Sequence, residues 1–373
     1  MINTYTSYRL IAQDIDRSLS QVKRQPVVER ETKYYLENIT KVKSIEEFVG
    51  DSRLFNYAMK AHGLQDMAYA KAFMIKALKE GVSDPQSFAN KLSDKRYVEF
   101  VKSYNFATHG ENATVYSQAQ QGTAQRYQLQ AVLVGVPPDN PVLKAQTEAY
   151  LAGIAKVTSI DQFLADDALY TFALNAWELT DKLGDKAFIR KLLEGGVADD
   201  DSFANKQTDK RYAAFAAAFD FAALGERATT YTTAQHGAVD KYLRQTLEEN
   251  AGAQNEGVRL ALYFQRKAPT LTNVYQILAD PALAKVARTA LGLPEAVAGA
   301  NIDQQAKLLS ARIDLDDFKN PQALGKFLAR FSAMWEATNS QTVKTPLTAI
   351  LFSQPTEFNI STDALIALSR LRK

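Results

Sequence analysis

The sequence contains no cysteine and only three histidines among its 373 residues. The absence of cysteine excludes disulfide bonds, thiolate metal sites and cysteine nucleophiles. The histidines, His62, His109 and His236, occupy no equivalent positions in the internal repeat described below, and no two have the spacing of metal ligands on one helix. We interpret them as ordinary core or surface residues, and we expect no catalytic site, no cofactor and no metal ion.

The sequence also lacks long apolar runs and any large excess of charge. Its formal net charge is +2, which gives no indication of a nucleic-acid partner. No segment approaches the roughly 20 apolar residues of a membrane-spanning helix, and the first residues do not resemble a secretory signal peptide. Phosphate-binding glycine loops and nucleophile-elbow motifs are missing as well. We expect no nucleic acid, no membrane span, no signal peptide and no small-molecule substrate.

What the sequence does contain is a long internal repeat. Sliding the chain by about 115 residues aligns residues 44–130 with 159–245 without a gap, and about 39 of the 87 positions are identical. Ser-Phe-Ala-Asn-Lys at 87–91 returns at 202–206. With 46% hydrophobic residues overall, each domain-sized unit has enough apolar material to bury its own core.

A third, diverged copy follows the first two. Its aligned positions include Val274, Asp280, Leu283, Phe318 and Asn320. We therefore predict an all-α protein made of three tandem modules of five or six helices each. The predicted boundaries are 28–136 for repeat 1, 143–250 for repeat 2 and 255–338 for the third segment, with an N-terminal amphipathic helix over 1–27 and a C-terminal tail over 339–373.

Several helix boundaries can be predicted from capping residues. Asp51, Asp166 and Asp280 each precede a run of apolar residues at helical spacing and are expected to be N-caps. The dipeptides Asp-Pro at 84–85 and Asn-Pro at 320–321 also indicate helix starts. Gly81 and its counterpart in repeat 2 are typical of helix ends. The one extended stretch that we expect is 131–136, before a proline-rich linker.

The two ends are candidate partner-binding elements. Residues 1–27 place apolar side chains on roughly one face of a helix. Residues 339–359 are rich in Thr, Ser, Gln and Pro and are expected to be extended, whereas residues 360–373 suggest a short helix whose apolar face includes Leu365 and Leu368. Such amphipathic ends either bind partners or simply pack on the body of the protein.

The tetrapeptide Asp-Lys-Arg-Tyr, at 94–97 and again at 209–212, is the strongest candidate for a binding motif. Its cations Lys95, Arg96, Lys210 and Arg211 would meet an acidic partner on two equivalent surfaces. The alternative is structural: the aspartate caps a helix, the tyrosine packs, and the cations form surface ion pairs that contribute little stability.

The pattern Ser-Phe-Ala-Asn-Lys, Asp-Lys-Arg-Tyr and Phe-Ala-x-x-Gly-Glu resembles an uncharacterised domain-of-unknown-function family of alphaproteobacteria whose genes lie in flagellar gene clusters. The resemblance covers repeats 1 and 2 well and the third segment loosely. It implies a structural protein of bacterial motility, located in the flagellum or basal body or in the cytoplasm, whose partners are other flagellar proteins or further copies of itself. Two other hypotheses are a cytoplasmic scaffold or chaperone-like adaptor, and an enzyme with an unfamiliar carboxylate or lysine site.

Overall fold

The computed structural model describes residues 3–339, and every regular element in that range is helical. This confirms the all-α prediction for the described residues. None of their helices is both long and apolar enough to cross a membrane. The predicted helix at 360–373, with Leu365 and Leu368, lies outside the described residues.

Repeat 1 and the segment before it form ten α-helices, two of which have only four residues. They are α1 (Thr4–Gln13), α2 (Ile15–Lys23), α3 (Pro26–Ile39), α4 (Ile45–Gly50), α5 (Ser52–Ala61), α6 (Lys71–Glu80), α7 (Phe88–Lys91), α8 (Arg96–Ser103), α9 (Phe106–His109) and α10 (Thr123–Leu133).

Repeat 2 follows the same order, with a turn in place of the four-residue α7. Its helices are α11 (Pro141–Ile154), α12 (Ile160–Ala165), α13 (Asp167–Ala176), α14 (Lys186–Gly195), α15 (Lys210–Ala218), α16 (Phe221–Leu224) and α17 (Ala238–Gln254). Each repeat thus has more helices than the five or six expected, because single-turn helices leave no periodic apolar pattern to detect.

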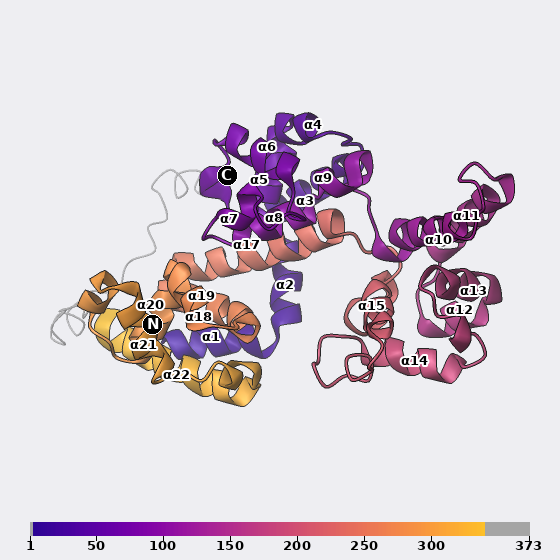
Figure 1. The fold of residues 1–373 in the computed structure, drawn as a ribbon. Helices are drawn as coiled ribbons and strands as arrows, with labels where there is room; N and C mark the ends of the chain where they lie inside the picture. The colour runs from indigo at the N-terminus through magenta and orange to yellow at the C-terminus, as the bar shows by residue number, and fades with distance from the viewer. Residues whose placement is uncertain (1–2, 340–373) are drawn as a thin grey trace, which may run out of the picture.

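The third segment contributes five described α-helices, and α1 packs among them (Figure 1). They are α18 (Glu256–Lys267), α19 (Val274–Ala279), α20 (Pro281–Ala290), α21 (Ile302–Ser310) and α22 (Pro321–Asn339). Buried Tyr8 of α1 belongs to the same apolar cluster as Phe264 and Phe331. The N-terminal residues from α1 onward therefore pack on the body of the protein, which was one of the two alternatives for this end.

Most of the predicted caps are present. The carboxylates of Asp51, Asp166 and Asp280 each accept two backbone N–H bonds from the first turn of the helix that follows. Asn320 likewise caps α22, with Pro321 in its first turn. Gly81 ends α6 with a positive φ of 68°, where an added Cβ would lie 2.7 Å from the Cβ of Ala107. These local predictions are confirmed.

Three local predictions are wrong. Within the predicted N-terminal helix over 1–27, residues 4–23 form two helices instead of one, because the carboxylate of Asp14 accepts from Arg17 N and starts a new helix. Residues 131–133 complete α10 and are not extended. The Asp-Pro at 84–85 opens a turn and not a helix, because Asn90 Nδ2 donates to the carbonyls of Val82 and Asp84 and holds the loop.

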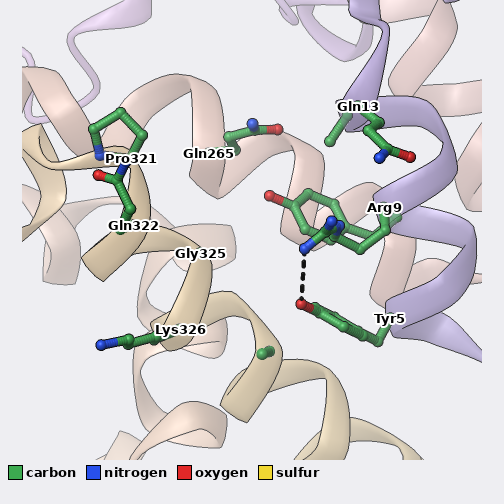
Figure 2. Close-up of a pocket in the computed structure, with 11 residues that line it drawn as sticks. Tyr5, Arg9, Gln13, Gln265, Pro321, Gln322, Gly325 and Lys326 are labelled. Atoms are coloured by element: carbon green, nitrogen blue, oxygen red, sulfur yellow. Dashed lines mark hydrogen bonds between the residues drawn. The ribbon is translucent and has the colours of Figure 1, made fainter.

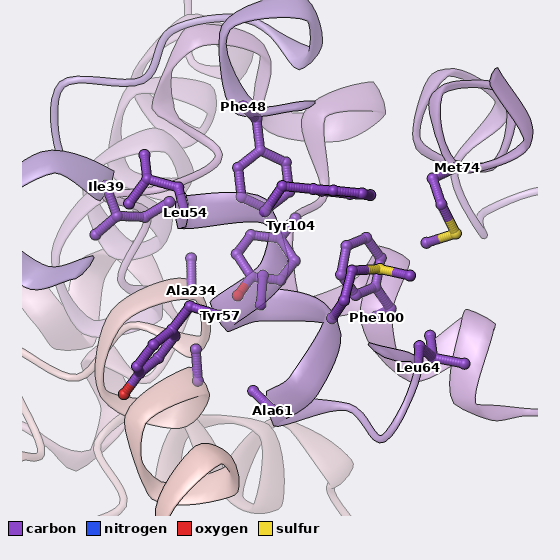
Figure 3. Close-up of a cluster of buried hydrophobic side chains, with 14 of the residues drawn as sticks. Ile39, Phe48, Leu54, Tyr57, Ala61, Leu64, Met74, Phe100, Tyr104 and Ala234 are labelled. Carbon is purple, nitrogen blue, oxygen red and sulfur yellow. The ribbon is translucent and has the colours of Figure 1, made fainter. Parts of the chain in front are cut away.

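The main difference from expectation concerns how the cores are completed. Each repeat was expected to bury its own core, but α10 packs on α13 of repeat 2, whereas α17 packs on α5 of repeat 1 (Figure 1). The core of repeat 1 accordingly contains Ala234 and Tyr242 from repeat 2. Figure 3 shows Ala234 beside Tyr57 in this cluster. The last helix of each repeat, α10 or α17, therefore packs on the core of the other repeat, and we call this arrangement the exchange.

The exchange is reciprocal in its contacts. Tyr242 of α17 stacks on Tyr57 with ring centres 3.9 Å apart, and the aligned pair, Tyr127 of α10 and Phe172, stacks at the same distance. The turns that lead into the exchanged helices are also linked. Gln235 Nε2 donates to Thr114 O and Gln120 Nε2 donates to Thr229 O, both at 2.9 Å. Repeats 1 and 2 are therefore related by an approximate two-fold axis.

Candidate interaction site

The first Asp-Lys-Arg-Tyr motif lies at the start of α8. Asp94 accepts a hydrogen bond from Arg96 N at 2.9 Å and a two-pronged contact from the Arg96 guanidinium. Burial would raise the pKa of Asp94, but the hydrogen bonds from Arg96 outweigh it and the pKa lies below its ordinary value. Arg96 Nη1 also donates to Gly63 O at 2.5 Å, which ties α8 to the loop after α5. Tyr97 is buried.

The second motif repeats these contacts. The guanidinium of Arg211 is paired with Asp209 and donates to Glu178 O at 2.6 Å. Hydrogen bonds from Arg211 lower the pKa of Asp209. Lys210 Nζ donates to two carbonyls of the preceding loop at 3.0 and 3.2 Å, and Lys95 Nζ makes the equivalent bonds to Asn90 O of α7 and to Leu92 O at 2.9 and 3.0 Å.

Each of the four candidate cations therefore donates to backbone carbonyls of its own chain. These contacts join a loop to a helix at equivalent places in both repeats, and they account for the motif as an element of local structure. The proposed acidic partner of Lys95, Arg96, Lys210 and Arg211 stays a prediction. The other two candidate residues, Leu365 and Leu368, lie beyond the described residues.

A buried polar cluster that the sequence analysis did not identify lies where α17 crosses repeat 1. His62 Nε2 is 3.0 Å from Ser103 Oγ and 3.1 Å from Lys241 Nζ, and Lys241 also donates to Ser103 at 3.2 Å. Burial, reinforced by the charge of Lys241, lowers the pKa of His62 well below its usual value. Burial likewise lowers the pKa of Lys241. The cluster fixes α17 to α5 and α8.

The other two histidines lie in equivalent surroundings near the exchange. His109 stacks on Tyr116 with ring centres 3.6 Å apart, and His236 lies beside Tyr231 with ring centres 5.9 Å apart. Burial lowers the pKa of both histidines. Among residues 3–339, no group of three His, Cys, Asp or Glu side chains is arranged to hold a metal ion.

A groove of about 510 Å³ lies between α1 and α22 (Figure 2). Its wall on α1 carries Tyr5 and Arg9, with Arg9 Nη1 donating to Tyr5 Oη at 3.3 Å. Its wall on α22 carries Gln322 and Lys326, and Gln265 of α18 lies between them. The groove thus offers two cationic side chains and several amides around aromatic rings. This chemistry suits an acidic or amide-rich peptide segment.

The groove could not be found from the sequence because its walls are more than 300 residues apart. The apolar face of the first helix indicated only that α1 packs against something. The polar residues that face the groove belong to the other side of that helix, and nothing local distinguishes them from ordinary solvated residues.

Comparisons with known proteins agree with the repeat. The family model described as "Protein of unknown function (DUF1217)" matches the chain twice, at residues 61–184 and 176–324. Both matches begin inside a sequence repeat, so each one spans a junction between modules. No curated protein matches the chain.

A solved structure is similar over nearly the whole chain. It is the X-ray crystal structure of protein AGR_C_984 from Agrobacterium tumefaciens, which is 37% identical, with a TM-score of 0.53. The match covers 90% of this chain and 94% of that one. Together with the two matches to the family model, this similarity establishes that the chain belongs to the protein family of unknown function designated DUF1217.

Proposed function

We propose first that residues 255–338 are a diverged third copy of the repeat. In repeat 1, Tyr34 Oη donates to the N-cap Asp51 at 2.8 Å. In the third segment, Tyr263 Oη donates to the N-cap Asp280 at 2.5 Å. The tyrosine precedes the capping aspartate by the same number of residues in both places. A shared contact between aligned residues supports common descent more strongly than the weak sequence match does.

For the function, we propose that this chain is a non-enzymatic structural or interaction protein of the bacterial flagellum. The main support for an interaction role is the α1–α22 groove, which is lined by Arg9, Lys326 and Tyr5 on packed helices. The reciprocal exchange of α10 and α17 supports a rigid frame, because neither repeat can move without disturbing the core of the other. The flagellar setting rests on the resemblance of the repeated motif to a family encoded in flagellar gene clusters.

A partner segment would lie in the groove with acidic groups toward Arg9 and Lys326 and an apolar or amide side chain on Tyr5. Paired charges in such a partly exposed groove contribute mainly to specificity and association rate. Reversing both charges is therefore expected to weaken partner binding at low salt more than at high salt.

The experiment is swimming in soft agar by a deletion strain, with filaments counted by electron microscopy. Loss of filaments would support a role in assembly, and normal filaments with poor swimming would support a role in the motor or its regulation. Wild-type filaments and wild-type swimming would remove the flagellar proposal and leave a helical repeat protein of unknown role.

A matched pair of variants tests the groove in the same assay. The double variant Arg9→Glu/Lys326→Glu should fail to restore swimming to the deletion strain. The control, Lys33→Glu/Lys307→Glu, changes two cations that do not line the groove and should restore it. Equal restoration by both variants would contradict the groove as the partner site.

A further inference from the structure

Helices α10 and α11 form a hairpin on the side of the molecule away from α1 and α22 (Figure 1). The two helices are antiparallel, and Tyr127 Oη of α10 donates to Gln146 Oε1 of α11 at 3.0 Å. The hairpin exposes large apolar side chains, which we call the hairpin patch: Leu129 (58% exposed), Val132 (42%), Leu133 (70%), Val134 (80%) and Val142 (64%). Exposed apolar side chains that cluster in this way mark contact sites.

The aligned face of α17 shows how the other exchanged helix uses these positions. Leu129 and Leu133 align with Arg244 and Glu248. Glu248 is only 1% exposed and accepts two hydrogen bonds at 2.8 Å from Arg266 of α18, and α17 packs against both α2 and α18. On α10, two leucines take the place of this ion-paired surface. α10 therefore carries an apolar contact face that residues 3–339 leave exposed.

The hairpin patch has a fixed shape. Gly135 N donates to Val132 O at 3.0 Å where α10 ends, and Gly135 has a positive φ of 89°. Asn140 Oδ1 then accepts from Val142 N at 2.8 Å at the start of α11. A surface that is already ordered loses little conformational entropy when it binds.

The charges around the patch are balanced. The exposed charged residues of the hairpin, 123–152, are Arg126, Asp139, Lys144 and Glu148. Beside the hairpin, Glu178 accepts from Gln130 at 2.8 Å, and Arg211 donates to the Glu178 carbonyl. A surface with an excess of one charge would repel a copy of itself, whereas a balanced surface can bind its own copy.

The order of these charges determines how two copies can pair. Arg126 precedes the patch on α10, and Asp139 follows it in the connection to α11. If two α10 helices pack antiparallel about a two-fold axis at Val132, the start of each helix lies against the end of the other. Arg126 of each copy then approaches Asp139 of the other, which gives two equivalent ion pairs. Parallel packing would place like charges together.

We propose that the hairpin patch binds the same patch of a second copy of this chain, with the two α10 helices antiparallel. Because the patch lies away from the α1–α22 groove, the proposal does not rest on the function proposed above, and the dimer carries its two grooves at opposite ends (Figure 1). Helices of 11 and 14 residues give the hairpin a face about 20 Å long. Such a face buries less than the roughly 800 Å² per partner of a standard interface, so we expect a dimer that dissociates at micromolar concentrations.

Sedimentation equilibrium of the full chain, from low micromolar to sub-millimolar concentrations, measures the dissociation constant. Leu133→Glu should raise it at least about tenfold, because the change places an unpaired carboxylate in the contact twice per dimer. The control, Val27→Glu, changes a valine of α3 that is 59% exposed and should leave the dissociation constant unchanged. Circular dichroism should show the same helix content in both variants.

A charge exchange tests the antiparallel arrangement. Arg126→Asp and Asp139→Arg should each raise the dissociation constant roughly threefold or more, and the double variant should restore it. Because Arg126 also lies over Trp177, thermal unfolding of each variant checks that the repeats stay folded.

Two results would overturn the proposal: a chain that stays monomeric over the whole concentration range, or a dimer that Leu133→Glu leaves intact. A dimer that Leu133→Glu weakens and the double charge variant does not restore would overturn the antiparallel pairing.

Discussion

His62 in repeat 1 aligns with Trp177 in repeat 2. Each of the two side chains contacts the helix that comes from the other repeat, but with different chemistry. His62 contacts Lys241 of α17, whereas Trp177 donates to Thr123 Oγ1 at 3.1 Å and lies 4.0 Å from the guanidinium of Arg126, both on α10. Lys241 and Arg126 are themselves aligned. In both repeats an aromatic ring and a cation fix the exchanged helix, but only the histidine gains a titratable group near neutral pH when the chain unfolds.

The free energy of unfolding should therefore fall as the pH drops from 7.5 to 5.5. The pKa of His62 is lowered in the folded protein, so below about 6.5 the unfolded chain binds a proton that the folded chain does not. One such group lowers the free energy of unfolding by at most about 1.4 kcal/mol for each pH unit. When the free energy of unfolding is measured with urea at several pH values, it should depend less steeply on pH in His62→Gln than in the wild type. The remaining slope comes from His109 and His236, and equal slopes in both proteins would contradict a role for His62.

The Asp-Lys-Arg-Tyr motif can be tested at single residues. Arg96→Ala should lower the free energy of unfolding by about 1–3 kcal/mol, because it removes the partner of Asp94 and a hydrogen bond to Gly63 O. Lys95→Ala should change it by less than about 0.5 kcal/mol, as usual for an exposed side chain. Chemical denaturation measures both. Unchanged stability in Arg96→Ala would contradict the interpretation of the motif as an element of local structure.

Helix caps were predictable because they depend on neighbouring residues. The carboxylates of Asp51, Asp166 and Asp280 need only the free N–H groups one turn ahead. The failure at 84–85 has a cause further away, since the Asn90 side chain holds that loop as a turn. Local sequence therefore predicts a cap where nothing else competes for the backbone groups.

The exchange of α10 and α17 was not predictable from either helix. Both carry a tyrosine at the aligned position, Tyr127 and Tyr242, so the apolar pattern of each fits either core equally well. Which helix occupies which core depends on the course of the connecting turns, where Gln120 and Gln235 donate across the two-fold axis. The α1–α22 groove has the same limitation, because it depends on how distant helices pack.

A double-mutant cycle tests the exchange at the level of the element. Tyr57→Ala and Tyr242→Ala should each cost about 3–5 kcal/mol, with a coupling energy of about 0.5–1.5 kcal/mol from the stacked rings. The matched cycle pairs Tyr242→Ala with Phe172→Ala. That pair would couple only if α17 packed on its own repeat, so coupling there and not with Tyr57 would refute the exchange. Urea denaturation provides all the values.

For the whole molecule, the exchange predicts the behaviour of an isolated repeat. A fragment of residues 28–136 lacks α17 and exposes the face of α5 that Tyr242 covers. Its own α10 carries Tyr127 at the aligned position, so two fragments should exchange α10 and form a dimer with the geometry of repeats 1 and 2. Light scattering after size exclusion measures the mass. A stable, folded monomer would show that α10 can complete its own core.

The order in which the exchanged helices are synthesised follows from the same feature. α17 begins roughly a hundred residues after α10 ends, so at about 5–20 residues per second the ribosome needs about 5–20 s to produce it. During that interval the nascent repeat 1 has its α5 face open, and α10 is the matching helix already made. Hydrophobic collapse takes far less than a second. The core of repeat 1 therefore stays incomplete until α17 has been synthesised, and the wait for α17 is much longer than the collapse itself.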